Sequence, residues 1–420
     1  MQKDKQYHFP KDFLWGASVS THQVEGGNHN QWSVWELETA RVKAAQASYV
    51  YGHLANWKQI EKEATNPANY VSGHAANHFN KYEHDFAFAK QLNLNAMRSG
   101  IEWSRIEPEE GRFDLGALEH YRTYFAKMKA AGLEPILTLW HWTMPVWLAE
   151  KGGFEKRANV KYFVRYVAYL LEHAPELFTG YVITINEPTI YATESYWHRR
   201  WPPQQHAPIT TLKVLLNLAH AHRSAYKQIK RAHPEAVVGL AHNCAYVYAG
   251  DSSAFSKLSA WVGHRYGNEW FIRRVRRQQD FLGLNYYFAQ EFRGVKIKNP
   301  NRKLNDLGWD MQPEKLQLLL ERLWRRFKLP IIITESGTAD KNDTYRKWWI
   351  EESIRSIDRA QHNGVKMQGY IHWSLLDNFE WAEGFWPRFG LIEVNYKTQQ
   401  RKVRESAKWY ARFINRIGRQ

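Results

Sequence analysis

The feature that most constrains the fold of this 420-residue chain is a series of eight short apolar runs separated by longer segments with helical spacing. The runs are Phe13 to Ser18, Ala96 to Ile101, Pro135 to Trp140, Tyr181 to Ile185, Val237 to Ala241, Phe281 to Leu284, Ile331 to Thr334 and Met367 to Ser374. This alternation is expected of βα units around a parallel sheet. Eight units predict an α/β protein of the (β/α)₈, or TIM, barrel class.

The segments between the runs have the apolar spacing of helices that pack on one face. One stripe is Leu115, Leu118, Tyr121, Phe125 and Met128, ended by Gly132, and a closing helix is predicted from Ala407, Tyr410, Ile414 and Ile417. No Pro/Ser-rich linker or composition break divides the chain, so we expect residues 1–420 to form a single domain.

Two segments have no clear periodicity and are expected to be irregular. Residues 31–75 follow the first run, and residues 243–279 follow the fifth. Long loops on a barrel usually shape the active-site mouth, so we expect both to be long loops on the active-site side.

The chain is basic, with 58 Lys plus Arg against 42 Asp plus Glu. Such a balance is compatible with a nucleic acid, an anionic surface or solubility alone. Basic residues concentrate at Arg273, Arg274, Arg276 and Arg277, at Arg322, Arg325, Arg326 and Lys328, and from Arg401 to Arg419. The last two groups lie in segments with helical spacing and are typical of solvated faces, and no nucleic-acid recognition motif accompanies them. We therefore expect no nucleic-acid partner.

The remaining composition predicts a cytoplasmic protein with no membrane partner. The polar stretch Met1 to Pro10 does not resemble a signal peptide, and no window approaches 18 uninterrupted apolar residues. The single cysteine, Cys244, cannot form an internal disulfide. His74 with His78 and His220 with His222 are close in sequence but are more typical of structural histidines, and no phosphate-binding Gly-rich loop is present. We expect no metal and no cofactor.

Polar and aromatic side chains gather where the apolar runs end. They are Gln23 after the first run, Arg98 in the second, His141 and Trp142 after the third, Asn186 and Glu187 after the fourth, Asn285 to Tyr287 after the sixth, Glu335 after the seventh, and Trp373, Glu380 and Trp381 at or after the eighth. In a βα barrel, the C-terminal ends of the strands carry the chemistry. A lone Glu at such a place more often caps a helix, but the whole set at one rim favours an active site.

Two of these residues, Glu187 and Glu335, would face each other across the barrel mouth. Paired carboxyls can cleave a glycosidic bond with retention when they lie ~5–5.5 Å apart, or with inversion at ~6.5–9.5 Å. The sequence leaves that separation open. The 20 Trp, 23 Tyr and 20 Phe are compatible with sugar stacking, although many must belong to the core.

The motifs around these residues run in one order along the chain. They are Phe13-Leu-Trp-Gly-Ala-Ser, Thr21-His-Gln-Val-Glu-Gly, Trp103-Ser-Arg-Ile-Glu-Pro, Leu139-Trp-His-Trp-Thr-Met-Pro, Thr184-Ile-Asn-Glu-Pro, Leu284-Asn-Tyr-Tyr, Ile333-Thr-Glu-Ser-Gly, Trp373-Ser-Leu-Leu-Asp-Asn-Phe-Glu-Trp and Arg388-Phe-Gly-Leu. With these motifs, nearly the whole chain resembles glycoside hydrolase family 1, the β-glucosidase and β-galactosidase family. Two departures are Ser336, where the family most often has Asn, and residues 243–279, which are shorter than usual and rich in Arg.

The resemblance implies a role for each site residue. Glu335 would be the nucleophile, Glu187 the general acid/base, and Arg98 and Tyr287 the neighbours that favour the charged form of Glu335. The residues implied to contact the sugar hydroxyls are Gln23, His141, Asn186, Glu380 and Trp381. Trp373 would be the stacking platform and Trp309 the aglycone-side tryptophan, and Trp142, Asn285 and Phe389 complete the expected substrate site.

The predicted function is that of a retaining β-glycosidase acting on small-molecule β-glycosides or oligosaccharides. The resemblance favours a β-glucosidase with possible β-galactosidase or β-fucosidase activity. Glu380 would repel a sugar phosphate, so unphosphorylated sugars are expected. A transglycosidase of the same fold and a non-catalytic carbohydrate-binding protein remain as alternatives. The sequence does not indicate an oligomeric state.

Overall fold

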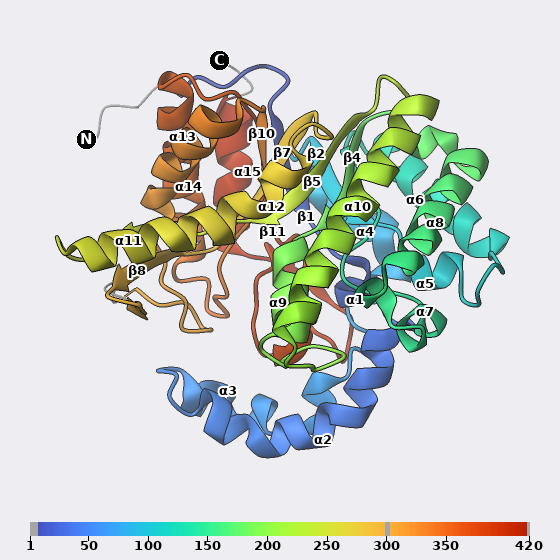
Figure 1. The fold of residues 1–420 in the computed structure, drawn as a ribbon, viewed down its shortest axis with the longest axis horizontal. Coiled ribbons are helices and arrows are strands. Elements are labelled where there is room, and N and C mark those ends of the chain that lie inside the picture. Colours follow the sequence, from blue (N-terminus) through green and yellow to red (C-terminus); the bar gives the residue numbers. More distant parts are fainter. Residues whose placement is uncertain (1–6, 299–302, 418–420) are drawn as a thin grey trace.

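The computed structural model describes residues 7–298 and 303–417, and within them the chain folds around a closed parallel barrel (Figure 1). Its strands are β1 (Leu14–Ser18), β2 (Ala96–Gly100), β3 (Glu134–Thr138), β4 (Tyr181–Asn186), β5 (Val237–Asn243), β7 (Phe281–Tyr286), β10 (Ile331–Ser336) and β11 (Met367–Trp373). They neighbour one another in the order β1-β11-β10-β7-β5-β4-β3-β2. Each strand overlaps one of the eight apolar runs, so the predicted barrel is confirmed.

The barrel contains a buried apolar cluster that takes one side chain from every strand. The cluster consists of Leu14, Ala96, Ile136, Ile183, Ala241, Phe281, Ile332 and Ile371. Bulky branched residues dominate it, as in other barrels of this class. The Phe281 ring fits because residue 239 on the neighbouring strand is Gly, where a Cβ would lie 2.9 Å from Cε1 of the ring.

Helices surround the barrel and bury their apolar stripes against it (Figure 1). The helices are α1 (Thr21–Val24), α2 (Gln31–Tyr51), α3 (Trp57–Ala64), η1 (Pro67–Tyr70), α4 (His78–Gln91), α5 (Trp103–Ile106), α6 (Leu115–Ala130), α7 (Val146–Glu150), η2 (Gly153–Glu155), η3 (Arg157–Asn159), α8 (Val160–His173), η4 (Pro175–Phe178), α9 (Pro188–Tyr196), α10 (Pro208–Ala232), α11 (Ala254–Gly263), η5 (His264–Glu269), α12 (Trp270–Val275), η6 (Pro313–Lys315), α13 (Leu316–Phe327), α14 (Arg346–His362), η7 (Trp381–Glu383) and α15 (Glu405–Ile417). The predicted helices at 115–130 and 405–417 are present.

One residue of the predicted stripe on α6 is misplaced. Leu115 is exposed, whereas Tyr124 joins Leu118, Phe125 and Met128 in the buried set. Leu115 is the first residue of the helix, directly after the Asp114 cap, so its side chain projects beyond the packed face.

The two segments expected to be irregular are largely helical, which corrects that expectation. Residues 31–75 contain α2, α3 and η1, and α2 starts with a capping box between Asn30 and Ser33. Its buried stripe after Trp35 consists of Ala40, Ala44 and Ala47. Alanine is only weakly apolar, so the sequence pattern does not reveal the buried face of this helix. Residues 243–279 contain α11, η5 and α12 after the short strand β6 (Tyr246–Ala249).

Two small sheets accompany the barrel. Strand β6 pairs with β8 (Ala289–Arg293), which pairs with β9 (Lys296–Lys298), and β12 (Ile392–Val394) pairs with β13 (Arg401–Val403). Within the described ranges, no helix combines the length and the apolar character needed to cross a membrane. Two parts of the sequence discussed above lie outside the described residues. They are residues 1–6 of the polar N-terminal stretch and Arg419 at the end of the basic C-terminal stretch.

Candidate active site

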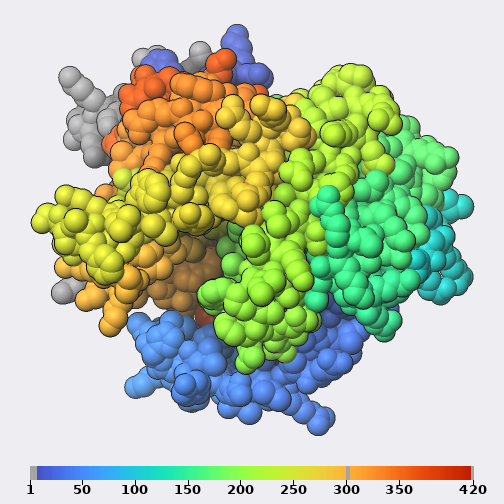
Figure 2. Space-filling view, viewed as in Figure 1, coloured from blue at the N-terminus to red at the C-terminus, as the bar shows by residue number. Residues whose placement is uncertain are grey.

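A cavity of about 220 Å³ opens at the C-terminal ends of the barrel strands. Figure 2 shows the molecule hollowed between α9, coloured green, and the orange segments that follow β7. Eleven of the fourteen expected site residues line the cavity: Gln23, His141, Trp142, Glu187, Tyr287, Trp309, Glu335, Trp373, Glu380, Trp381 and Phe389. The other three, Arg98, Asn186 and Asn285, lie behind this lining and are hydrogen-bonded to the carboxyl groups within it or to one another.

Glu335 stands near the end of β10, between a cation and a phenol. Arg98 donates from Nη1 to Oε1 of Glu335 at 2.5 Å, and the Tyr287 hydroxyl donates to Oε2 at 2.6 Å. Burial raises the pKa of Glu335 above its usual range, while Arg98 and Tyr287 oppose that rise. Residue 337, two positions after Glu335, must be glycine, because a Cβ there would lie 1.8 Å from the Trp373 carbonyl oxygen.

Glu187 follows β4 in a left-handed conformation, with φ of 39°, and α9 begins directly after it at Pro188. Its Oε1 accepts hydrogen bonds from the side-chain amides of Asn285, at 2.6 Å, and Asn243, at 3.2 Å. Burial, and then the nearby charge of Glu335, raise the pKa of Glu187 from 4.5 to about 8. The two glutamates thus differ in their neighbours: Glu335 has an arginine in contact, and Glu187 has neutral amides.

The residues behind the lining join the two glutamates into one network. Arg98 donates from Nη2 to Oδ1 of Asn186 at 2.6 Å, so it holds Glu335 and the residue before Glu187 with one guanidinium. Asn285 bonds Glu187 and accepts from the hydroxyl of Thr334, next to Glu335, at 2.7 Å. A network in which each group is held by its neighbours keeps both carboxyls in place before any ligand binds.

Gln23 and Glu380 form a second polar group on the lining. The Gln23 amide donates to Asn378 Oδ1 at 2.9 Å and to the Phe379 carbonyl at 2.8 Å, and it lies 3.4 Å from Glu380 Oε2. Its own Oε1 is buried and has no hydrogen-bond partner among the residues that the structure describes. Burial, and then the charges of Glu383 and Glu335, raise the pKa of Glu380 well above its usual range.

Aromatic rings make the rest of the wall rigid. Trp142 lies between Trp201, at 4.5 Å, and Trp381, at 4.8 Å between ring centroids. His22 stacks on Trp381 with an interplanar angle of 17°, and it is held by Glu36 at 2.7 Å. On the other side, Trp309 contacts Tyr287 and Phe389 through ring pairs. Such interlocked rings present fixed faces to a ligand at little entropic cost.

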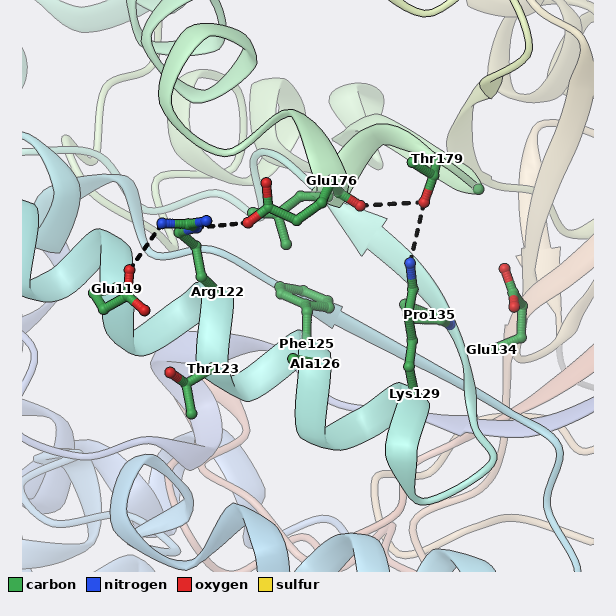
Figure 3. Close-up of a pocket in the computed structure, with 12 residues that line it drawn as sticks. Glu119, Arg122, Thr123, Phe125, Ala126, Lys129, Glu134, Pro135, Glu176 and Thr179 are labelled. Atoms are coloured by element: carbon green, nitrogen blue, oxygen red, sulfur yellow. Dashed lines mark hydrogen bonds and ion pairs between the residues drawn. The ribbon is translucent and has the colours of Figure 1, made fainter.

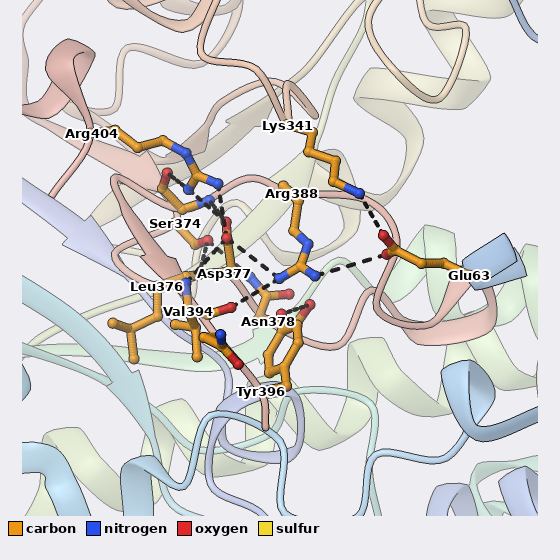
Figure 4. Close-up of polar contacts among 12 residues, drawn as sticks. Glu63, Lys341, Ser374, Leu376, Asp377, Asn378, Arg388, Val394, Tyr396 and Arg404 are labelled. Atoms are coloured by element: carbon orange, nitrogen blue, oxygen red, sulfur yellow. Dashed lines mark hydrogen bonds and ion pairs between the residues drawn. The ribbon is translucent and has the colours of Figure 1, made fainter. Parts of the chain in front are cut away.

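The segment that carries Glu380 is anchored by the buried carboxylate of Asp377 (Figure 4). Arg404 binds Asp377 with two parallel hydrogen bonds, at 2.8 and 2.9 Å, and the backbone N–H of Gly390 donates to the same carboxylate. Burial raises the pKa of Asp377, but Arg404 outweighs it, and the pKa lies below its usual range. Arg388, which precedes Phe389, lies 3.6 Å from Asp377. This ion cluster sets the path of the chain on both sides of Glu380.

Several cavity residues were not predicted from the sequence. They are Ile190, Glu194, Arg200, Trp201, Asn243, Phe288 and Glu383. Arg200 bridges Glu194 at 3.3 Å and Glu383 at 2.5 Å, so this ion triad borders the cavity. Asn243 could have been found, because β5 continues two residues beyond the apolar run and ends at it. The others lie on α9, on η7 or on loops, where proximity to strand ends gives no signal.

A larger hollow, of about 340 Å³, lies at the other end of the barrel (Figure 3). It is lined by residues at the starts of β3 and around η4, including Glu134 and Gly180. Arg122 binds Glu119 at 3.0 Å and Glu176 at 2.5 Å, so three of its charged groups pair with one another. Residues at the N-terminal face of a barrel serve stability rather than chemistry, so this hollow is not the candidate site.

Comparisons with known proteins agree with the geometry. The profile of the family described as Glycosyl hydrolase family 1 matches residues 5–277 and 271–419, in two parts that meet in the Arg-rich segment. Beta-glucosidase A of Acetivibrio thermocellus is 27% identical over 98% of the chain and 99% of its own length. Beta-galactosidase of Sulfolobus acidocaldarius is also 27% identical, over 98% and 96%. The solved beta-glycosidase from Pyrococcus horikoshii has a TM-score of 0.86 and 30% identity, covering 97% of this chain and 95% of that one.

Proposed function

The chain belongs to glycosyl hydrolase family 1 and is a retaining β-glycosidase, and on that premise we propose that Glu335 is its nucleophile and Glu187 its general acid/base. The observation that carries this assignment is the unequal environment of two carboxyls in one cavity. Arg98 lies 2.5 Å from Glu335, whereas the groups bonded to Glu187 are neutral amides. A fixed cation favours the charged form of the carboxyl it touches.

In the first step, Glu335 attacks the anomeric carbon of the β-glycoside and forms a glycosyl ester. The bond from that carbon to the leaving oxygen breaks, and Glu187 gives its proton to that oxygen. A pKa of about 8 keeps Glu187 protonated at neutral pH, as a general acid must be. Arg98 and Tyr287 hold the two oxygens of Glu335, so the attacking carboxylate is already oriented.

In the second step, Glu187 acts as a base. Once Glu335 is esterified it carries no charge, and the part of the pKa rise of Glu187 that comes from Glu335 disappears. The resulting carboxylate takes a proton from water, the water oxygen bonds to the anomeric carbon, and Glu335 leaves as a carboxylate. The sugar therefore departs with its original anomeric configuration.

The sugar is proposed to lie on Trp373, with its hydroxyls toward Gln23, His141, Asn186, Glu380 and Trp381. The unpartnered Oε1 of Gln23 supports this placement, because a buried acceptor without a donor costs free energy until a ligand supplies one. Trp142, Asn285 and Phe389 complete this substrate site, and Trp309 is proposed to contact the aglycone. A phosphate at the sugar would face Glu380, Glu383 and Glu335, so unphosphorylated sugars are the proposed substrates.

The proposed glycone is glucose, with galactose or fucose accepted as well. Relatives of similar identity are named as a β-glucosidase and as a β-galactosidase, so the scaffold is compatible with either epimer. The substrates are small β-glycosides or oligosaccharides, and a cytoplasmic location is proposed from the sequence alone.

The test is release of nitrophenol from the β-glucoside, β-galactoside, β-fucoside and β-mannoside, with Glu335→Gln as the blank. We expect turnover of the glucoside to be fastest, and a 2-deoxy-2-fluoro glucoside to add its sugar mass to the parent but not to the variant. Equal sugar binding by parent and variant, without turnover by either, would point instead to a binding protein. Transfer to an added alcohol that outpaces hydrolysis would identify a transglycosidase.

A further inference from the structure

Helix α11 is apolar on the face turned to solvent as well as on the face turned to the protein. Its buried side, at Ser256 and Ala260, packs on β6 and β8. Its exposed side continues into η5 as the stripe Phe255, Leu258, Val262 and Tyr266, whose side chains are 40–60% exposed. A surface helix of a globular protein normally turns polar residues outward, so this stripe has the character of an interface that nothing within residues 7–298 and 303–417 covers.

The turn between β8 and β9 extends the same surface. The backbone N–H of Gly294 donates to Ser256 Oγ at 2.8 Å, which holds the turn against the start of α11. Beside it, Val295 is 69% exposed and Ile297 is 55% exposed. Figures 1 and 2 show α11, coloured yellow, projecting beyond the neighbouring helices. We call the exposed residues Phe255, Leu258, Trp261, Val262, Tyr266, Val295 and Ile297 the apolar ridge.

Cations border the apolar ridge. Lys257, Lys296 and Lys298 are exposed between its members. Three shallow hollows follow along η5, α12 and the end of α13, and they are lined mainly by Arg265, Arg273, Arg274, Arg276, Arg277, Arg322 and Arg326. Trp261 and Tyr266 of the ridge line two of these hollows, so the apolar and basic surfaces are continuous.

The acidic groups on these elements offset only part of the basic surface. Glu269 is buried and lies 2.6 Å from Arg265 and 3.6 Å from Arg326, and Glu291 is bound by Arg293 at 2.8 Å. Asp251, before α11, is exposed and accepts from the backbone N–H of Ser253. The accessible charge around the apolar ridge is therefore predominantly positive.

We infer that the apolar ridge and its cations form a docking surface for an anionic phospholipid bilayer. Aromatic and aliphatic side chains would enter the headgroup region while Lys and Arg bind lipid phosphates, as in helices that lie in a membrane interface. A second copy of the chain would bring two basic surfaces together, which costs free energy. A nucleic acid would pair with the arginines but leave the ridge in water. This inference departs from the expectation of no membrane partner, and it does not depend on the catalytic roles.

The apolar part is tested with the full chain, sedimented with phosphatidylcholine vesicles that contain or lack phosphatidylglycerol. We expect binding to the anionic vesicles, and a loss of at least tenfold in the double variant Phe255→Ser, Leu258→Ser. The control is Leu37→Ser, Val42→Ser on α2, two side chains that are 70% and 55% exposed and should not affect binding. Thermal unfolding of each variant verifies its fold.

The charged part is tested with the double variant Lys257→Gln, Lys296→Gln. Each lysine near an anionic surface contributes roughly fivefold to the affinity, so losing both should weaken binding about thirty-fold. The control is Lys58→Gln, Lys62→Gln on α3, two exposed lysines away from the ridge. Added salt should weaken binding of the parent.

Five results would overturn the inference. They are no binding to either vesicle, equal binding to both, and unchanged binding by either ridge variant. The fourth is a concentration-dependent dimer, seen by light scattering, that the Phe255→Ser, Leu258→Ser variant abolishes without any vesicle binding by the parent. The fifth is binding of an oligonucleotide that Lys257→Gln, Lys296→Gln weakens, without any vesicle binding by the parent, which would assign the surface to nucleic acid.

Discussion

Replacing Glu187 by Gln should change how the stability of the protein depends on pH. In the folded chain, burial and the charge of Glu335 raise the pKa of Glu187 from 4.5 to about 8. The folded state therefore holds this proton more tightly than the unfolded state does. The resulting stability is fully present below the unfolded pKa and is lost as pH rises through the folded pKa. Gln does not titrate, so the variant lacks this loss.

The size of the effect follows from the same pKa values. Each unit of difference corresponds to about 1.4 kcal/mol, so the parent should lose up to about 4 kcal/mol of unfolding free energy between about pH 5 and about pH 8. Glu335 titrates in the same cavity and will share part of this change. Relative to the parent, Glu187→Gln should therefore gain about 2–4 kcal/mol over that interval.

Urea unfolding of parent and variant at several pH values measures this difference. Glu405→Gln is the matched control, because it makes the same substitution at a side chain that is 78% exposed. In the parent, kcat/KM should fall on the alkaline side near the pKa of about 8. The variant should lose this limb together with about 10²–10⁴-fold in rate on substrates with poor leaving groups. A stability difference between variant and parent that stays constant across pH would refute the reasoning.

Three further predictions follow from single contacts. Arg98→Met leaves the carboxyl of Glu335 buried without its cation, so turnover should fall at least about 10³-fold, and urea unfolding should show a loss of about 3–5 kcal/mol; near-parental turnover would contradict the proposed role. Asp377→Asn weakens the double hydrogen bond from Arg404, so the melting temperature should fall and KM should rise more than kcat falls; an unchanged KM would separate this ion cluster from the site. Trp309→Ala should lower kcat/KM about tenfold for aryl glycosides and less for a methyl glycoside, and an equal loss on both would place Trp309 outside the aglycone site.

The barrel could be predicted because its signal is local and repeated. Nearly all strand residues are buried, so the strands are short and mostly apolar runs, and eight such runs leave few other architectures. Helices α2 and α11 escaped the same reasoning for opposite reasons. The stripe of α2 consists of small residues such as Ala40 and Ala44. On α11, the large apolar residues such as Phe255 and Leu258 are exposed while polar Ser256 is buried, so neither helix has the contrast that defines an amphipathic helix.

The position of the cavity could be predicted because strand ends meet at one rim, but its outer border could not. Arg200 contacts both Glu194 and Glu383, and Glu383 lies 183 residues away from it in the sequence. That contact depends on where α9 and the loop after β11 lie relative to each other, which no local pattern encodes. Asn243 was missed for a simpler reason: the strand continues past its last apolar residue.

The chemical difference between the two glutamates comes from neighbours contributed by other strands. Glu187 and Glu335 are the same residue type, both are buried, and burial raises the pKa of each. Only Glu335 receives Arg98, which reaches across from β2, and Tyr287, which follows β7. Removing those donors should bring the two pKa values together, and the proposed acid and nucleophile would then lose their distinction while both carboxyls remained in place. The assignment of roles therefore depends on the closed barrel, which brings residues 98, 287 and 335 to one point.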